Sequence, residues 1–112
     1  MRKHNGNRSM IGVGSPVVDM VAQVPEEFLI HAGGAKGGME LVDAEALALL
    51  QEALPDTTVR TPGGSAGNTA FAMARLGIPS RFLGTVGSDT PGAFYRECFE
   101  ALGGCGMAIR TH

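Results

Sequence analysis

Apolar and polar residues follow two different periods along the chain, and each change of period marks the boundary of an expected element. Short apolar or β-branched runs predict strands over residues 10–14, 17–24, 39–42, 57–61, 81–86 and 107–110. Apolar residues at helical spacing predict helices over residues 25–31, 44–54, 66–76 and 90–102. Strands that alternate with helices favour an α/β fold with a parallel sheet and right-handed crossovers.

Capping residues support the expected helix ends. Asp43 and Asp89 each stand directly before a helical pattern, where a carboxylate can accept from a first-turn N–H. Ser65 is expected to do the same for the helix over 66–76. That helix is expected to stop at Gly77, with Pro79 two residues further on.

A glycine pair, Gly63 and Gly64, precedes the helix over 66–76. Without a Cβ, these residues can adopt backbone conformations closed to other residues and let a ligand approach closely. The first turn of the helix leaves backbone N–H groups available for oxygen atoms. Asn68 lies in that turn and offers amide donors and an acceptor to a polyhydroxylated ligand. The same pattern fits a tight turn in which Asn68 is only a local cap.

The spacing of several small and polar residues resembles the N-terminal signature of the ribokinase family of carbohydrate kinases, also called the PfkB family. The matching positions are Gly63, Gly64, Ala66, Asn68, Ala70, Gly77 and Gly87. The resemblance extends back over residues 12–19, GVGSPVVD, and forward through Asp89 and Gly92. The Gly-Ser-Pro-x-x-Asp and Gly-Gly-Ser segments are most similar to the adenosine kinase branch.

The resemblance implies an α/β, ribokinase-like fold that is incomplete: a parallel sheet with flanking helices plus a small β lid. Residues 1–112 would be the N-terminal part of one such domain. Residues 1–9 would form a flexible leader, about 16–61 the lid and its supporting helices, and 62–112 the glycine loop and the αβ core units.

The implied activity is transfer of the γ-phosphate of ATP to a hydroxymethyl group of a sugar or nucleoside. In the family pattern Asp19, Gly64 and Asn68 would hold ribose-like hydroxyl groups. Ser15, Gly63 and Ser65 would lie close by. Met39 and Leu41 would either lie against the apolar part of the substrate or pack inside the lid. From its sequence context alone, Asp19 could equally face water on the open side of a sheet.

The family's second signature, a C-terminal Gly-Ala-Gly-Asp segment with the catalytic aspartate and the anion hole, is absent from this sequence. We therefore assign no catalytic, cofactor-binding or metal-binding residue within the chain. ATP and Mg²⁺ are implied by the family only. Because complete members are longer, we expect the N-terminal portion of a kinase that is inactive by itself.

Two other functions fit parts of the sequence. A non-catalytic module that binds a nucleoside or sugar, or that pairs with another chain, would use the exposed edges of the lid sheet. A homodimer formed through lid strands is one such pairing. A dinucleotide-binding fragment is disfavoured because Val17 replaces the third glycine after GVG and Pro16 interrupts the expected helix. Lys36 lacks the spacing and the following Ser or Thr of a phosphate-binding loop.

The composition of the chain limits the classes of binding partner that we expect. A hydrophobic content of 44%, a charged content of 18% and a formal net charge of −2 are typical of a soluble globular chain. They give no electrostatic reason to expect nucleic acid or an anionic membrane. Cys98 and Cys105 have no companion His/Cys cluster, which argues against a zinc site. With no signal peptide and no run of transmembrane length, a cytoplasmic location is expected.

Overall fold

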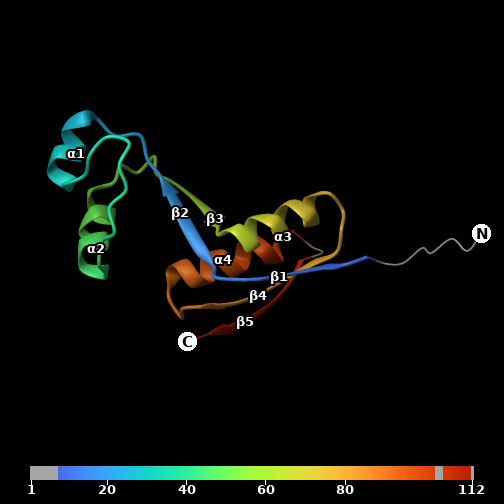
Figure 1. The fold of residues 1–112 in the computed structure, drawn as a ribbon. Coiled ribbons are helices and arrows are strands. Elements are labelled where there is room, and N and C mark those ends of the chain that lie inside the picture. Colours follow the sequence, from blue (N-terminus) through green and yellow to red (C-terminus); the bar gives the residue numbers. More distant parts are fainter. Residues whose placement is uncertain (1–7, 103–104, 112) are drawn as a thin grey trace, which may run out of the picture. The chain divides into compact units, whose positions relative to one another are not determined.

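The computed structural model describes residues 8–102 and, for the backbone, the strand at 105–111. Its nine elements follow in the order β1 (Met10–Val13), β2 (Val17–Val21), α1 (Glu26–Ala32), α2 (Ala44–Ala53), β3 (Val59–Gly63), α3 (Ser65–Arg75), β4 (Ser80–Val86), α4 (Thr90–Glu100) and β5 (Cys105–Thr111) (Figure 1). The chain divides into two compact units, of which one is Met20–Arg60 and the other, the core unit, holds β1, α3, β4, α4 and β5. Strands β2 and β3 pair as a separate two-stranded sheet.

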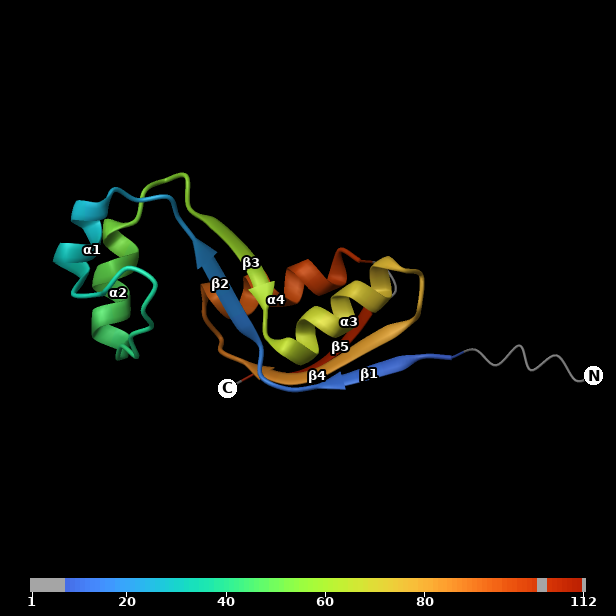
Figure 2. The ribbon, with the colours of Figure 1, turned by 45° about the horizontal axis from the view of Figure 1, so that its top comes forward.

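The core unit is built on a three-stranded parallel sheet in the order β1-β4-β5. Helices α3 and α4 lie on the same face of this sheet (Figures 1 and 2). The alternation along β4 explains this placement, because Ser80, Phe82 and Val86 are buried whereas the residues between them are more exposed. One face of the sheet is therefore apolar, and the two helices pack against it.

An aromatic cluster fills the space between the sheet and its helices. Phe82 and Phe99 are fully buried and Tyr95 is 1% exposed. Phe99 lies at the centre, with ring centroids 5.2 Å from Tyr95, 5.6 Å from Phe82 and 5.2 Å from Phe71. Such aromatic pairs contribute about 0.5–1.5 kcal/mol each beyond the burial of their area. The cluster thus joins β4, α3 and α4 into one packed body.

The opposite face of the sheet carries Ile11, Val13 and Leu83, which are 59%, 71% and 38% exposed. Both helices of the core unit lie on the other side, so no described element of the core unit itself covers this face. Parallel sheets are normally buried on both faces. The apolar side chains here have the composition of a face that takes a second layer.

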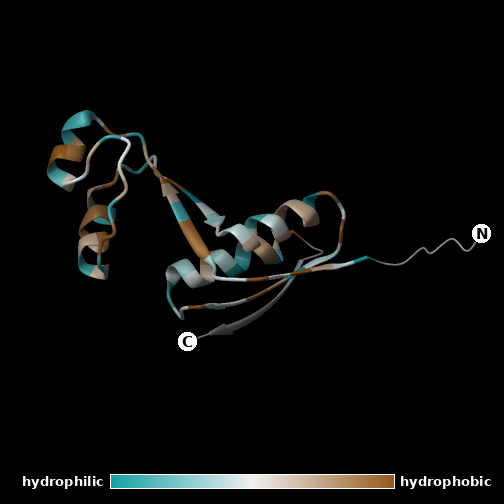
Figure 3. Ribbon diagram, in the orientation of Figure 1, coloured by the Kyte–Doolittle hydropathy of each residue, from teal (hydrophilic) through white to brown (hydrophobic). Residues whose placement is uncertain are grey.

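The Met20–Arg60 unit consists of α1, α2 and the connections around them, and Figure 3 shows hydrophobic bands on both helices. Asp43 caps α2, because its Oδ1 accepts from the Ala46 N–H at 2.8 Å. An apolar groove of about 400 Å³ lies between the helices, lined by Phe28, His31, Ala32, Val42, Ala46, Leu49, Leu50 and Ala53. Neither helix contains a fully buried residue, so this unit has a small core.

The sequence predicted most of these elements. The two aspartate caps are confirmed, since Asp89 Oδ1 accepts from the Gly92 N–H at 2.9 Å as Asp43 does in α2. The stop at Gly77 is also confirmed. Gly77 has φ 81°, and the Ile78 N–H donates to Met73 O at 3.0 Å in the hydrogen-bond pattern of a glycine-terminated helix.

Two sequence predictions were wrong. Residues 39–42 form no strand, and Met39 and Leu41 are 94% and 100% exposed. A strand needs a partner for its backbone groups, and among the described residues β2 pairs only with β3. Ser65 is not the cap of α3, since the N-cap is Gly64 and no side chain caps it. Ser65 is itself the first helical residue because the chain turns into the helix one position earlier.

Several boundaries also differ from the sequence predictions. The second strand ends at Val21 rather than 24, and the last strand begins at Cys105 rather than 107. Most of the predicted leader, residues 1–7, and the first half of the predicted break after α4, residues 103–104, lie outside the described residues. In the part of the chain that the structure describes, no helix has the length and hydropathy needed to cross a bilayer.

Neighbouring residues of β4 lie on opposite faces of the sheet, so we expect their substitutions to change stability by different amounts. We expect Phe82→Ala to lower the free energy of unfolding by about 3–5 kcal/mol, because it removes a fully buried ring from the aromatic cluster. The adjacent change Leu83→Ala should cost about 1 kcal/mol or less, since Leu83 is already 38% exposed. Urea unfolding followed by circular dichroism measures both. If Phe82→Ala does not fold, Phe82→Leu replaces it. The reverse ranking would contradict the assignment of faces.

Candidate functional site

The candidate site is built around the turn between β3 and α3. Gly63 ends β3 and is buried, and Gly64 follows with φ 87° and ψ 139°, a backbone conformation that side chains disfavour. The first intrahelical bond of α3 runs from the Asn68 N–H to Gly64 O at 2.8 Å. The amides of Ser65, Ala66 and Gly67 precede that bond, so they have no acceptor within the helix. They form a set of donors at the positive end of the helix dipole.

Asp19 lies directly over this turn. A Cβ placed on Gly63 would overlap the Asp19 carboxylate, with 2.7 Å to its Cγ. Only glycine at position 63 therefore lets the carboxylate take its observed place. Asp19 is the one charged residue of β2, and its side chain is exposed. An acceptor-only group thus stands in solvent beside the glycine turn.

The segment after β1 approaches the same turn just as closely. A Cβ on Gly64 would stand 2.7 Å from Ser15 O, and one on Gly14 would stand 2.9 Å from Ala66 Cβ. Gly12 is nearly as tight, at 3.1 Å from Ala66 O. These contacts bring Ser15 against Gly64 and press the end of β1 onto the first turn of α3.

A buried tyrosine fixes the turn from the other side. The Tyr95 hydroxyl donates to Gly63 O at 3.0 Å, across 32 positions of sequence. Sequence reasoning did not single out Tyr95. Its spacing with Phe99 places both on one face of α4 and predicts burial, but no local signal reveals a hydrogen bond to a carbonyl on a distant loop.

The remaining predicted residues are placed as follows. Ser65 and Asn68 are both exposed on the first turns of α3, and Ser65 O accepts from Thr69 Oγ1 at 2.9 Å. Met39 belongs to the Met20–Arg60 unit, so its part in the site stays a prediction. The structure therefore brings together Ser15, Asp19, Gly63 and Gly64, with Ser65 and Asn68 following directly in α3. We call these six residues the glycine-loop site.

Two open hollows lie at the carboxyl ends of the core strands, the edge where parallel α/β sheets usually bind ligands. One, of about 490 Å³, is lined by residues 13–16 and 83–85 and shares Ser15 with the glycine-loop site. The other, of about 340 Å³, lies between residues 86–89 and the first turns of α4. Ser15 thus borders both the glycine-loop site and the larger of the two hollows.

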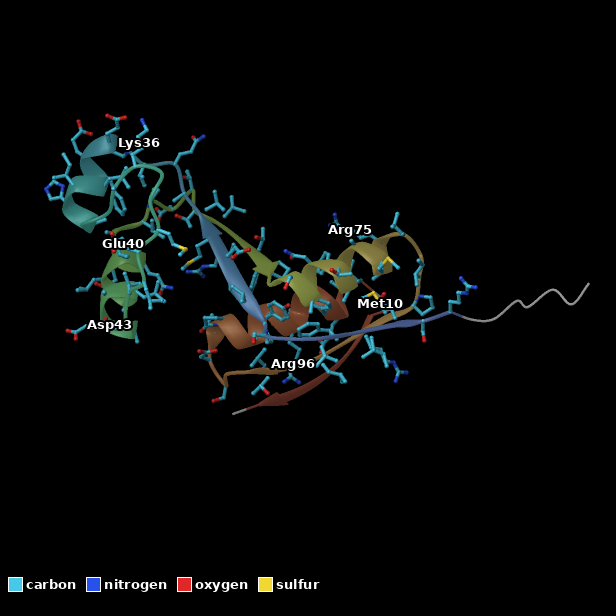
Figure 4. The ribbon with its side chains drawn as sticks, viewed as in Figure 1. Met10, Lys36, Glu40, Asp43, Arg75 and Arg96 are labelled. Atoms are coloured by element: carbon cyan, nitrogen blue, oxygen red, sulfur yellow. The ribbon has the colours of Figure 1, made fainter. Side chains whose placement is uncertain are left out.

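Charged and thiol groups elsewhere have ordinary structural surroundings. Lys36 lies on the loop beside α1 (Figure 4) and pairs with Glu26, both side chains being more than three-quarters exposed, so the pair contributes little to stability. Arg75, near the end of α3, stacks over the Phe71 ring at 5.3 Å. Burial, and secondarily Glu97, raises the pKa of the Cys98 thiol, which makes it a poor nucleophile at neutral pH.

The comparisons with known proteins decide the family. The model of the pfkB family of carbohydrate kinases matches residues 39–103, more than half of the chain. The chain belongs to the pfkB family of carbohydrate kinases. This agrees with the resemblance found in the glycine-rich segment, because the match includes the glycine pair, α3 and all of α4.

Solved structures of sugar and adenosine kinases share the fold. A probable sugar kinase from Rhizobium etli CFN 42 is 31% identical with a TM-score of 0.75, over 93% of this chain and 31% of that one. The adenosine kinase of Sinorhizobium meliloti is 30% identical with a TM-score of 0.76, over 96% and 32%. A fructokinase from Xylella fastidiosa with bound ATP is 25% identical with a TM-score of 0.60, over 93% and 26%. The chain thus spans about a third or less of the length of these kinases and has part of the ribokinase-like fold.

The glycine turn makes a prediction about backbone strain. Gly64→Ala should lower the free energy of unfolding by more than about 2 kcal/mol, because it adds an overlap with Ser15 O to an unfavourable φ. The control is Gly77→Ala, where φ is 81° but no atom lies within 4 Å of the new Cβ. It should lose only the conformational part, about 1–2 kcal/mol. Thermal and urea unfolding compare the two variants, and equal losses would show that the close approach of Ser15 adds nothing.

Proposed function

We propose that the glycine-loop site binds the acceptor alcohol of an ATP-dependent sugar or nucleoside kinase. The acceptor would be a molecule with adjacent ring hydroxyls and a hydroxymethyl group, to which the γ-phosphate of ATP is transferred. The observation that carries the proposal is the exposed Asp19 carboxylate, held over Gly63 beside the first turn of α3. Family membership and the sugar and adenosine kinases among the structural neighbours support it.

The chemistry of the site suits a polyol. A carboxylate offers two oxygens that can accept from two neighbouring hydroxyl groups, and these charge-assisted bonds are among the stronger ones. The Asn68 amide both donates and accepts, so it can pair with a hydroxyl in either role. The amides at the start of α3 supply further donors. Together these groups would fix the orientation of a sugar ring, which is how positioning lowers the barrier to group transfer.

Glycine at positions 63 and 64 would give the ligand access to the backbone. Any side chain at Gly63 would displace Asp19, and any side chain at Gly64 would meet Ser15 O. The substrate hydroxyls would therefore contact a bare backbone surface bordered by one carboxylate. Met39 and Leu41, both almost fully exposed, are candidates to contact the apolar part of the acceptor.

ATP use follows from the family, and it is consistent with the ATP-bound fructokinase among the neighbours. The described residues hold no group of three or more His, Cys, Asp or Glu side chains that could bind a metal ion. The Gly-Ala-Gly-Asp segment is absent from the sequence as well. We assign this chain the acceptor side of the reaction because the glycine-loop site lies within it.

A substitution at Asp19 tests the acceptor site. In titration calorimetry of the 112-residue chain with adenosine, ribose and fructose, we expect weak binding of at least one of them. Asp19→Asn should weaken that binding about tenfold or more, because it removes a charged acceptor. Asp56→Asn is the matched control, since Asp56 is an exposed aspartate in the other unit. Equal affinity of the two variants would contradict the assigned role of Asp19.

An activity assay tests whether this chain, which holds the proposed acceptor site, can transfer phosphate by itself. We expect the purified 112-residue chain to transfer no phosphate from ATP and Mg²⁺ to adenosine, ribose or fructose, because the signature that carries the catalytic aspartate is absent. Formation of ADP that depends on the acceptor, measured by a coupled assay, would overturn this. Tight binding without turnover would instead favour a binding module over one side of a kinase site.

A further inference from the structure

We propose that Tyr95 is a positioning residue for the glycine-loop site and that Gly67 provides the space for its hydroxyl group. The inference rests on the proposed function for what the loop binds, but the contact itself is independent of the ligand. Tyr95 is 1% exposed, so we infer no direct contact between its side chain and a ligand. It acts through the carbonyl of Gly63, to which its hydroxyl donates at 3.0 Å.

The phenol ring has little freedom to move. Tyr95 is 1% exposed, and its ring stacks on Phe99 at 5.2 Å with an interplanar angle of 27°. Phe82 contacts it from the sheet, with ring centroids 5.9 Å apart. Since a buried aromatic ring held on two sides cannot shift cheaply, the position of the hydroxyl is set by the core. The core in turn sets the position of the Gly63 carbonyl.

Gly67 makes this contact possible. A Cβ at position 67 would overlap the Tyr95 hydroxyl, whereas the ring carbon Cζ would stand at 3.4 Å, an ordinary contact. Gly67 lies inside α3, where glycine is less favourable than alanine. A glycine in this place is explained by the hydroxyl group and not by the ring, because a phenylalanine ring would leave room for alanine.

The bond also aims the donor that follows it. Gly63 C=O and Gly64 N–H belong to one peptide plane, and in the trans form they point in opposite directions. No cis peptide bond occurs among the described residues. Because the carbonyl of Gly63 points to a buried hydroxyl, the Gly64 N–H points away from the core. Tyr95 thus orients a backbone donor of the proposed acceptor site from 32 residues away.

The contact can be tested from both sides with a double-mutant cycle. Gly67→Ala should lower the melting temperature in the wild-type background, because its methyl group meets the Tyr95 hydroxyl. In the Tyr95→Phe background the same change should be neutral or should raise the melting temperature, since the overlap is gone and alanine favours the helix. A loss of equal size in both backgrounds would overturn the assignment of Gly67 to the hydroxyl group.

Resonance positions show whether Tyr95 orients the loop at Gly63 and Gly64 or only packs in the core. In Tyr95→Phe we expect the ¹³C′ resonance of Gly63 and the amide resonance of Gly64 to move, and Gly67→Ala should move the same resonances. Val86→Ala is the control, because it removes buried volume from the same cluster but takes away no hydrogen-bond donor to the Gly63 carbonyl. It should lower stability and leave these resonances in place. Tyr95→Phe with unchanged resonances would show a core residue only.

Calorimetry then links the contact to the ligand. Tyr95→Phe should weaken binding of the best of adenosine, ribose and fructose about fivefold, the ratio that corresponds to one net hydrogen bond, while Val86→Ala should not. If the wild-type chain binds none of the three, the proposed acceptor site fails, and the resonances and the cycle still decide the role of Tyr95. If Tyr95→Phe moves the resonances but not the affinity, the loop is held by Tyr95 without tuning the site, which overturns the positioning role.

Discussion

The close approach of three backbone segments at glycine positions is the constraint on which the candidate site depends. Asp19 takes its place only because Gly63 has no side chain, and Ser15 reaches the turn only because Gly64 has none. A side chain at position 63 or 64 would push apart the segments that carry these functional groups. The geometry of the site therefore depends on the absence of side chains at these glycines as well as on its polar groups. The neighbouring groups approach these glycines more closely than a side chain at either position would allow.

The aromatic cluster gives this arrangement its rigidity. Phe82 on β4 and Phe99 on α4 hold the ring of Tyr95, and the Tyr95 hydroxyl holds the carbonyl of Gly63. The same cluster packs α3 onto the sheet, so the helix that begins at the glycine turn is fixed along its length. A single run of contacts thus leads from the core to the loop. We propose that this loop meets the acceptor of the phosphate.

The sequence predicted the parts of the structure that local patterns control. Asp43 and Asp89 were recognised as caps, and Gly77 as a helix end, because each acts on backbone groups a few residues away. Residues 39–42 were predicted as a strand from composition alone, yet a strand depends on a partner elsewhere in the chain. Ser65 was predicted as the cap because serine is a good cap. Gly64, with φ 87° and ψ 139°, is instead the N-cap residue, and the residue pattern does not encode where that turn falls.

The site was predicted in the same uneven way. Spaced motifs identified Ser15, Asp19, Gly63, Gly64 and Asn68, and the structure places the first four in close contact. Tyr95 could not be found this way, since its role depends on a hydrogen bond across 32 positions and on packing between three elements. Gly67 lies between the matching positions Ala66 and Asn68, but the sequence pattern does not explain why this residue is glycine. The structure does, because a Cβ at position 67 would overlap the Tyr95 hydroxyl.

The central claim is that a polyol binds on the glycine turn between β3 and α3. The most direct measurement is a titration of the isotope-labelled chain with ribose and with adenosine, followed by amide resonances in solution. We expect the largest shifts at Gly63, Gly64, Ser65 and Asn68, with the Asp19 resonance changing over the same range of ligand concentration. Shifts concentrated instead at residues 83–85 or along the groove between α1 and α2, with the glycine turn unchanged, would contradict it.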